Sequence, residues 1–370
     1  MKSKKLGEIV NIIDKKNVDN LDLDVLGVGK DKIFFPTIAD LKDVDTSKYK
    51  IIKESYFACK FMSVGRDWFL PISLNIEKSN YLISPAYKTF QLNEDSNLNP
   101  GYLMLLFQNM EFDRYLGFIS SGGIRGELSM DRFLEVDIPI PSNDKVQENI
   151  SKTWVSIRKN INQIEQKIFN SEKLIKNYFA YLSQKHDLQK IVNFIKLSED
   201  RNSNNIYCDK DVKSLSITKA FIDSNKKIKE DVSKYSIVKS KEFAYIPVTS
   251  RNGEKISISY NKFDPILVSN TYPVFKIINS NLIPEYLHAW VSRSEFDRYS
   301  RYHSWGTARE VFNFNNMENV EIPIASLEEQ QNIVNISNNI DKLKKLRENY
   351  LSYISKFSQI IFSGIKLDRL

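Results

Sequence analysis

Apolar residues recur at alternating spacings of three and four over two long stretches of the chain. The first stretch passes through Trp154, Ile157, Ile161, Ile164, Ile168, Ser171, Ile175, Tyr178 and Leu182. The second passes through Ile333, Ile336, Ile340, Leu343, Arg347, Tyr350, Ile354, Phe357 and Ile361. Neither stretch contains proline or glycine, and this spacing is typical of a coiled-coil seam. The pattern predicts two long coiled-coil helices, residues 142–185 and 326–370, packed antiparallel; a core helix of an ordinary bundle is the alternative.

The residues before each predicted helix have a mixed pattern of strands and shorter helices. Runs of β-branched and aromatic residues favour strands at 32–35 and 243–248. Proline suits the first turn of a helix, which predicts helices that begin at Pro100 and Pro284. The expected fold class is therefore α+β (mixed α/β), with two globular domains held apart by the long helices. Their expected bounds are 1–141 and 186–325.

An internal repeat relates the two halves of the chain. Residues 112–150 align without gaps onto 296–334, and 13 of these 39 positions are identical. The identities include Gly122/Gly306, Arg125/Arg309, Ile138-Pro139-Ile140/Ile322-Pro323-Ile324 and Gln147/Gln331. Shorter matches are Lys48-Tyr49 with Lys234-Tyr235, Phe57-Ala58 with Phe243-Ala244, and Ile9-Val10-Asn11 with Ile191-Val192-Asn193. Matches that keep the same order indicate a tandem duplication, each half about 185 residues long.

Charge and cysteine content narrow the class of protein only slightly. The net charge of the 370 residues is +7, which weakly favours a polyanionic partner. Residues 1–141 carry 18 Lys and Arg against 20 Asp and Glu, and residues 186–325 carry 20 against 17, so the globular parts are close to neutral. No apolar run is long enough to span a membrane. The two cysteines, Cys59 and Cys208, lie far apart, and we expect a reducing, cytoplasmic location.

Motifs of enzymes are weak throughout. Residues 99–102 (Asn-Pro-Gly-Tyr) resemble the loop that holds the target amine in amino-methyltransferases, but the second proline of that motif is missing. Residues 27–30 lack the spacing of a phosphate-binding loop, and the Glu-x-Lys at 165–167 falls on the heptad pattern. Three histidines and two cysteines show no metal-ligand spacing. We predict no catalytic, cofactor-binding or metal-binding residue.

Together with the duplication, the end of each globular part resembles a known family. Residues 122–150, with a Gly/Arg loop, Ile138-Pro139-Ile140-Pro141 and Gln147, are similar to the end of a target recognition domain in the specificity subunits of type I restriction–modification systems. The second copy, at 305–333, is closer at its Glu329-Gln330 helix start. Two departures, Lys145-Val146-Gln147 for Glu-Gln in the first copy and Ala325 for the final proline, affect only the junction with the helix.

The resemblance implies a division of labour. Each globular half would read one half of a bipartite site in double-stranded DNA, and the helices would set the spacer between the half-sites. Two methyltransferase subunits would dock on the helices, joined by restriction/translocase subunits. S-adenosylmethionine, ATP and Mg²⁺ would belong to those partners, with no cofactor in this chain. Phe169 and Phe179, off the seam, offer docking area for a partner or pack on the globular parts.

Candidate DNA-binding residues lie in or beside two turns, at 64–67 and 250–253, and in the repeated Gly/Arg loop. Arginine suits guanine and phosphate, and asparagine suits adenine. The arginine kept in both loops also fits a phosphate contact or a structural brace. A coiled-coil scaffold that binds only protein is the alternative function. The candidate residues are Lys60, Arg66, Arg125, Arg251, Asn252, Lys255 and Arg309.

Overall fold

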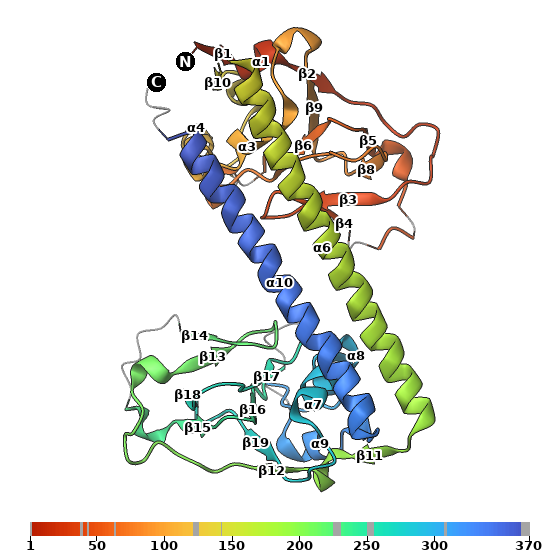
Figure 1. Cartoon of the computed structure of the whole chain (residues 1–370), viewed down its shortest axis with the longest axis vertical. Helices are drawn as coiled ribbons and strands as arrows, with labels where there is room; N and C mark the ends of the chain where they lie inside the picture. Colours follow the sequence, from red (N-terminus) through yellow and green to blue (C-terminus); the bar gives the residue numbers. More distant parts are fainter. Residues whose placement is uncertain are drawn as a thin grey trace. The chain divides into compact units, whose positions relative to one another are not determined.

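The computed structural model describes residues 2–37, 40–42, 44–62, 64–120, 126–141, 143–224, 231–249, 255–306 and 309–363 (Figure 1). The chain divides into two compact units. Unit 1 comprises residues 1–165 and 344–370, and unit 2 comprises residues 166–343. Two long helices, α6 (Asp144–Lys185) and α10 (Leu327–Ile361), each contribute one part to both units. The mixed α+β class and the two long helices are confirmed.

Unit 1 contains two four-stranded sheets and a two-stranded ribbon. The first sheet has the order β2-β9-β6-β7, all neighbours antiparallel, and the second has the order β4-β3-β8-β5, with β3 and β8 parallel. The ribbon joins β1 to β10. The strands are β1 (Lys2–Lys5), β2 (Val10–Ile13), β3 (Val25–Val28), β4 (Phe34–Pro36), β5 (Lys50–Ile52), β6 (Phe57–Cys59), β7 (Ile72–Leu74), β8 (Tyr81–Ile83), β9 (Lys88–Leu92) and β10 (Asp137–Ile140).

In the described part of unit 1, five short α-helices accompany these sheets. They are α1 (Leu6–Ile9), α2 (Val64–Asp67), α3 (Pro100–Phe107), α4 (Met110–Ile119) and α5 (Met130–Leu134). The core of unit 1 includes Phe57 on β6 stacked on Phe90 of β9, with ring centroids 4.8 Å apart. Helix α3 begins at Pro100, as predicted, and the side chain of Asn99 caps it by accepting a hydrogen bond from the Gly101 amide.

Unit 2 repeats most of this plan. Its four-stranded sheet has the order β12-β19-β16-β17, and β11–β20, β13–β14 and β15–β18 form antiparallel pairs. Phe243 on β16 stacks on Phe275 of β19 at 5.0 Å, as Phe57 does on Phe90. The elements are β11 (Leu188–Lys190), β12 (Ile195–Leu197), β13 (Lys213–Leu215), β14 (Phe221–Asp223), β15 (Ser236–Val238), β16 (Glu242–Tyr245), β17 (Ile258–Tyr260), β18 (Ile266–Val268), β19 (Val274–Ile277), β20 (Glu321–Pro323), α7 (Pro284–Val291), α8 (Ser294–Tyr302) and α9 (Phe314–Glu318).

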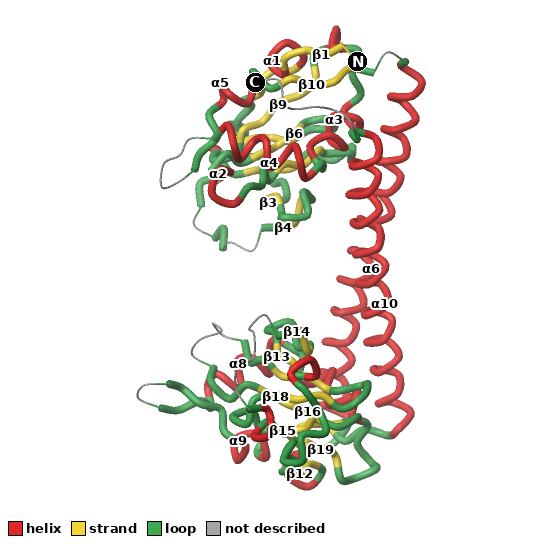
Figure 2. The backbone as a smooth tube through the Cα atoms, turned by 90° about the vertical axis from the view of Figure 1, so that its left-hand side faces the viewer, coloured by secondary structure: helices red, strands yellow, loops and turns green. Residues whose placement is uncertain are grey.

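The two long helices run antiparallel within each unit. In unit 1 the amide Nδ2 of Asn160 donates to the hydroxyl of Tyr350, and further along α6 Glu165 pairs with Arg347, closer to the start of α10. In unit 2 Lys185 at the end of α6 pairs with Glu329 at the start of α10. The residues of both predicted seams are buried or half-buried. Figure 2 shows that α6 and α10 are helical along their length. None of the described helices combines the length and apolarity needed to cross a membrane.

Two pairings of the repeat are wrong in register. The amides of Leu6 and Ile191 donate to the equivalent carbonyls of Val136 and Val320, both at 2.8 Å, so Leu6 rather than Ile9 corresponds to Ile191. The three-residue Ile-Val-Asn match therefore gave the wrong register, and the hydrogen bonds beside the ribbon strands give the correct one. The second correction concerns Gln147, whose structural partner is Gln330 and not Gln331, as the hydrogen bonds of both glutamines show below.

Candidate nucleic-acid interface

In unit 1 the segment that carries Lys60 and Arg66 lies against the chain that follows α4. The Gly65 amide donates to the Gly126 carbonyl at 2.7 Å, and the Leu128 amide donates to the Phe61 carbonyl at 3.2 Å. Gly126 has a φ of +52°, and a Cβ there would lie 2.6 Å from the Arg66 amide nitrogen, so this close approach requires glycine. The structure thus joins the predicted turn to the repeated loop, although Arg125 itself lies outside the described residues.

Arg66 occupies α2, a single helical turn where the sequence predicted a loop turn. Its guanidinium is exposed and contacts Asp67 from the side, Nε to Oδ1 at 2.8 Å and Nη2 to Oδ2 at 3.1 Å. The hydrogen bond and the charge of Asp67 raise the pKa of Arg66. This contact uses one hydrogen of Nη2 and leaves Nη1 and the other Nη2 hydrogen, the edge with which arginine donates to guanine or phosphate. Lys60 is half-buried on the same segment.

The corresponding region of unit 2 has the same organisation. The Thr249 amide donates to the Glu310 carbonyl at 3.0 Å, and Trp305 and Val311 exchange backbone hydrogen bonds. Arg309 is exposed on the turn between Trp305 and Val311. Gly306 is required there, because a Cβ would lie 2.0 Å from the Arg309 carbonyl oxygen. Lys255 is exposed, whereas Arg251 and Asn252 lie outside the described residues.

A buried ion pair that the sequence analysis missed supports this region in unit 1. Lys32, in the hairpin between β3 and β4, places its Nζ 2.7 and 2.8 Å from the two carboxylate oxygens of Asp113 on α4. Asp113 also accepts the Leu70 amide at 3.1 Å. Burial lowers the pKa of Lys32 and raises that of Asp113. The pair fixes the hairpin to the helix that leads into the candidate loop.

Unit 2 contains the same pair at repeat-related positions. Lys219, in the hairpin between β13 and β14, lies 2.5 Å from Asp297 on α8, and Asp297 accepts the Ile256 amide at 3.2 Å. Both lysines have a positive φ, +58° for Lys32 and +62° for Lys219. The repeated Phe-Asp-Arg-Tyr of α4 and α8 was the available signal for the aspartates, but nothing local to the hairpins identified their lysine partners.

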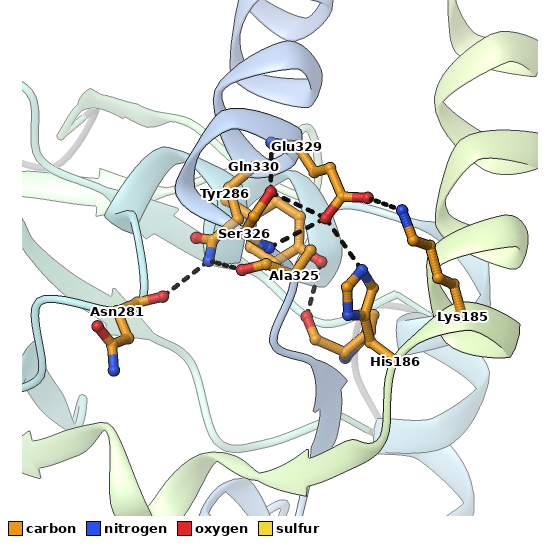
Figure 3. A network of polar contacts seen from close by, with 9 residues as sticks. Lys185, His186, Asn281, Tyr286, Ala325, Ser326, Glu329 and Gln330 are labelled. Atoms are coloured by element: carbon orange, nitrogen blue, oxygen red, sulfur yellow. Dashed lines mark hydrogen bonds and ion pairs between the residues drawn. The ribbon is translucent and has the colours of Figure 1, made fainter.

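A second duplicated network joins each globular part to its long helix (Figure 3). In unit 2 Gln330 accepts the Ile283 amide at 2.9 Å and donates to the Asn281 carbonyl at 2.7 Å. Gln147 makes the same two contacts, with Asn99 and Asn97, in unit 1. The hydroxyls of the equivalent tyrosines in α3 and α7 donate to the carbonyls of the equivalent prolines in β10 and β20. These pairs are Tyr102 with Pro139 and Tyr286 with Pro323.

Glu329 ties the start of α10 to the end of α6 within unit 2. Its carboxylate accepts the Ser326 amide at 3.0 Å, Lys185 Nζ at 2.8 Å and a hydrogen bond with His186 Nε2 at 2.9 Å (Figure 3). The Lys185 hydrogen bond, followed by those from Ser326, lowers the pKa of Glu329 to about 2. The Glu-Gln pair at 329–330 is thus a structural element at the junction of helix and globular part.

The segments that were compared with enzyme motifs take part in local structure. Tyr102 is buried and engaged with Pro139, and residues 99–102 start α3. Gly29 accepts and donates backbone hydrogen bonds in the turn of the β3–β4 hairpin, and Glu165 pairs with Arg347. Phe179 is fully buried against Tyr286 and Trp290, which contradicts a docking role, while Phe169 is exposed. Among the described residues, no group of His, Cys, Asp and Glu is arranged to hold a metal ion.

The fold of the whole chain is similar to that of a known specificity subunit. The crystal structure of the type I restriction–modification system S subunit from M. genitalium matches with a TM-score of 0.56 and 12% identity, over 99% of this chain and 95% of that chain.

Two further structures match over similar lengths at lower TM-scores. The first comes from a study of complex assembly and conformational transition of the type I R-M system, with a TM-score of 0.37 and 11% identity over 98% of this chain and 96% of that chain. The second is the HsdS subunit from Thermoanaerobacter tengcongensis, with a TM-score of 0.36 and 12% identity over 100% of this chain and 97% of that chain. Neither a protein-family model nor a curated protein matches the sequence.

Proposed function

We propose that this chain is the DNA-specificity subunit of a type I restriction–modification system. The observation that carries the proposal is the similarity of fold to an S subunit over nearly the full length of both chains. The duplicated architecture supports it, because two similar units suit the two halves of a bipartite DNA site. In this proposal each globular part reads one half-site and the chain itself is not catalytic.

Base reading is assigned to the region where the two candidate segments meet. Unit 1 supplies the exposed Arg66 with Lys60, and unit 2 supplies Lys255 with Arg251 and Asn252. The arginine repeated in both loops, Arg125 and Arg309, is assigned to a phosphate contact or a structural brace. The shared backbone frame and the differing side chains, Val-Gly-Arg-Asp at 64–67 against Ser-Arg-Asn-Gly at 250–253, suit two readers of different sequences.

The long helices are assigned two further tasks. Their length sets the spacer between half-sites, and their outer faces, including the exposed Phe169, dock two methyltransferase subunits that bind S-adenosylmethionine. Restriction/translocase subunits using ATP and Mg²⁺ complete the complex.

Sequencing of methylated DNA from a host with and without this chain tests the proposal. We expect a bipartite methylated motif that disappears when the chain is deleted and returns on complementation. A motif that persists in the deletion strain, or a chain that binds the methyltransferase but never alters methylation, favours a protein scaffold instead.

A further inference from the structure

The same basic turn occurs in both units. In each unit it lies outside the proposed base-reading region. In unit 1 Asp45 caps a 3₁₀ turn by accepting the Ser47 amide at 3.0 Å. In unit 2 Asp231 caps the same turn by accepting the Ser233 amide at 2.9 Å. Each carboxylate also accepts the hydroxyl of its serine. Both turns continue into the repeated Lys-Tyr that the sequence comparison identified.

A buried asparagine holds a second segment beside each turn. The Asn17 amide donates to the Tyr49 carbonyl at 2.9 Å, and the Asn202 amide donates to the Tyr235 carbonyl at 3.1 Å. Both asparagine side chains are almost fully buried, at 0% and 1% exposed. Each asparagine follows a cation. Lys16 in unit 1 bridges to Lys50 and Arg201 in unit 2 bridges to Ser236, each two residues beyond the lysine of the turn.

These cations make few internal contacts among the described residues. Internal hydrogen bonds account for the repeated aspartates, serines and asparagines, but Lys16, Lys48 and Lys234 are exposed. Lys48 has only a 3.7 Å contact with Asp45 and is 78% exposed. In the described part of the chain neither Arg201 nor Lys234 forms an ion pair, and Arg201 donates to the Ser236 hydroxyl.

In unit 2 the cations line a concave surface pocket. Among the described residues its lining is polar and includes no carboxylate. It consists of Arg201, Ser203, Ser233, Lys234 and Asn270. Two cations with hydroxyl and amide donors in one hollow fit a phosphate group, because several charge-assisted hydrogen bonds can converge on its oxygens. Asp231 lies nearby. Each of its carboxylate oxygens accepts a hydrogen bond from Ser233, and its charge attracts Lys234.

We propose that this pocket in unit 2, and the Lys16–Lys48 pair at the repeat-related place in unit 1, hold backbone phosphates of duplex DNA. The inference rests on the proposed function. Two units that read different bases share only what all DNA has in common, which is the phosphate backbone. Contacts to it are therefore expected to stay alike in both copies while the base-reading turns diverge.

The test compares Arg201→Gln/Lys234→Gln with Lys241→Gln, an exposed lysine of unit 2 outside the pocket. The full chain, co-purified with the methyltransferase encoded beside it, is titrated with a duplex containing its methylated motif and with a scrambled duplex, at several salt concentrations. We expect the double variant to bind both duplexes roughly tenfold more weakly. The slope of log affinity against log salt should fall by about one, and Lys241→Gln should bind as the wild type does.

Each outcome has a separate meaning. Absence of DNA binding by the wild-type complex overturns the proposed function and this inference with it. Wild-type binding that is matched by a folded double variant, with an unchanged melting temperature, overturns the phosphate contact alone. A loss confined to the motif duplex overturns it too, because that result indicates base reading. Lys16→Gln/Lys48→Gln repeats the experiment in unit 1, where the same uniform loss is expected.

Discussion

The buried pair of Lys32 and Asp113 makes a prediction about stability in which the direction of the pH dependence is decisive. Asp113→Asn removes the carboxylate charge but keeps an oxygen that accepts the Leu70 amide. It leaves a 95%-buried lysine without its counter-charge, and the loss of one partner from a buried ion pair costs about 3–5 kcal/mol. Lys32→Met leaves the carboxyl instead, which can take up a proton. The combined variant removes both charges and should recover most of the loss.

The two single variants are expected to respond to pH in opposite directions. In Asp113→Asn burial keeps the pKa of Lys32 below its ordinary 10.5, so the unfolded chain binds more protons and stability rises with pH through the folded pKa. In Lys32→Met burial keeps the pKa of Asp113 above its ordinary 3.8, so stability falls as pH rises through the folded pKa. Each slope is at most about 1.4 kcal/mol per pH unit.

Native-state hydrogen exchange on α4 peptides, at a series of pH values between the ordinary pKa values of 3.8 and 10.5, measures these free energies, corrected for the intrinsic exchange rate. Helix α8 in unit 2, with its own Asp297–Lys219 pair, is the matched internal control and should keep its protection. Equal slopes in the two single variants, or a combined variant no more stable than either one, would refute the argument that uncompensated charge causes the loss.

Three further predictions follow from the same contacts. Arg66→Ala should relax recognition of one half-site only, by about 1–3 kcal/mol if the exposed edge of the guanidinium contacts a base, and competition binding with half-site variants measures this. The low pKa of Glu329 confers stability above pH 4.5 that is lost as pH falls towards about 2, and Glu329→Gln should remove this contribution. Acid titration followed by circular dichroism measures the difference. An unchanged acid midpoint would contradict the prediction. One heptad inserted in register into both α6 and α10 should lengthen the spacer by about three base pairs, since seven residues add roughly 10 Å. The half-sites also turn by about a third of a DNA turn. Methylated motifs with an unchanged spacer would contradict the proposal that the helices set the spacer length.

Sequence alone determined the features that local periodicity and local backbone chemistry encode. The two seams, which contain Ile161 and Ile354, predict two long helices because apolar residues spaced alternately by three and four positions fall on one side of an α-helix. Pro100 and Pro284 mark helix starts because proline suits the first turn. The internal repeat was visible because duplicated residues such as Phe57 and Phe243 keep the same place in the core.

Tertiary structure decided what depends on residues far apart in the chain. Lys32 reaches Asp113 across 81 positions, and neither residue has a local signature of a buried ion pair. The true partner of Gln147 is Gln330. Gln147 lies eight residues after Pro139, whereas Gln330 lies seven residues after the equivalent Pro323, and only the hydrogen-bonded carbonyls reveal this shift. Likewise Phe179, which lies off the seam, is buried by α7. Heptad position specifies which side of a helix a residue occupies, but the neighbouring elements decide whether that side meets solvent.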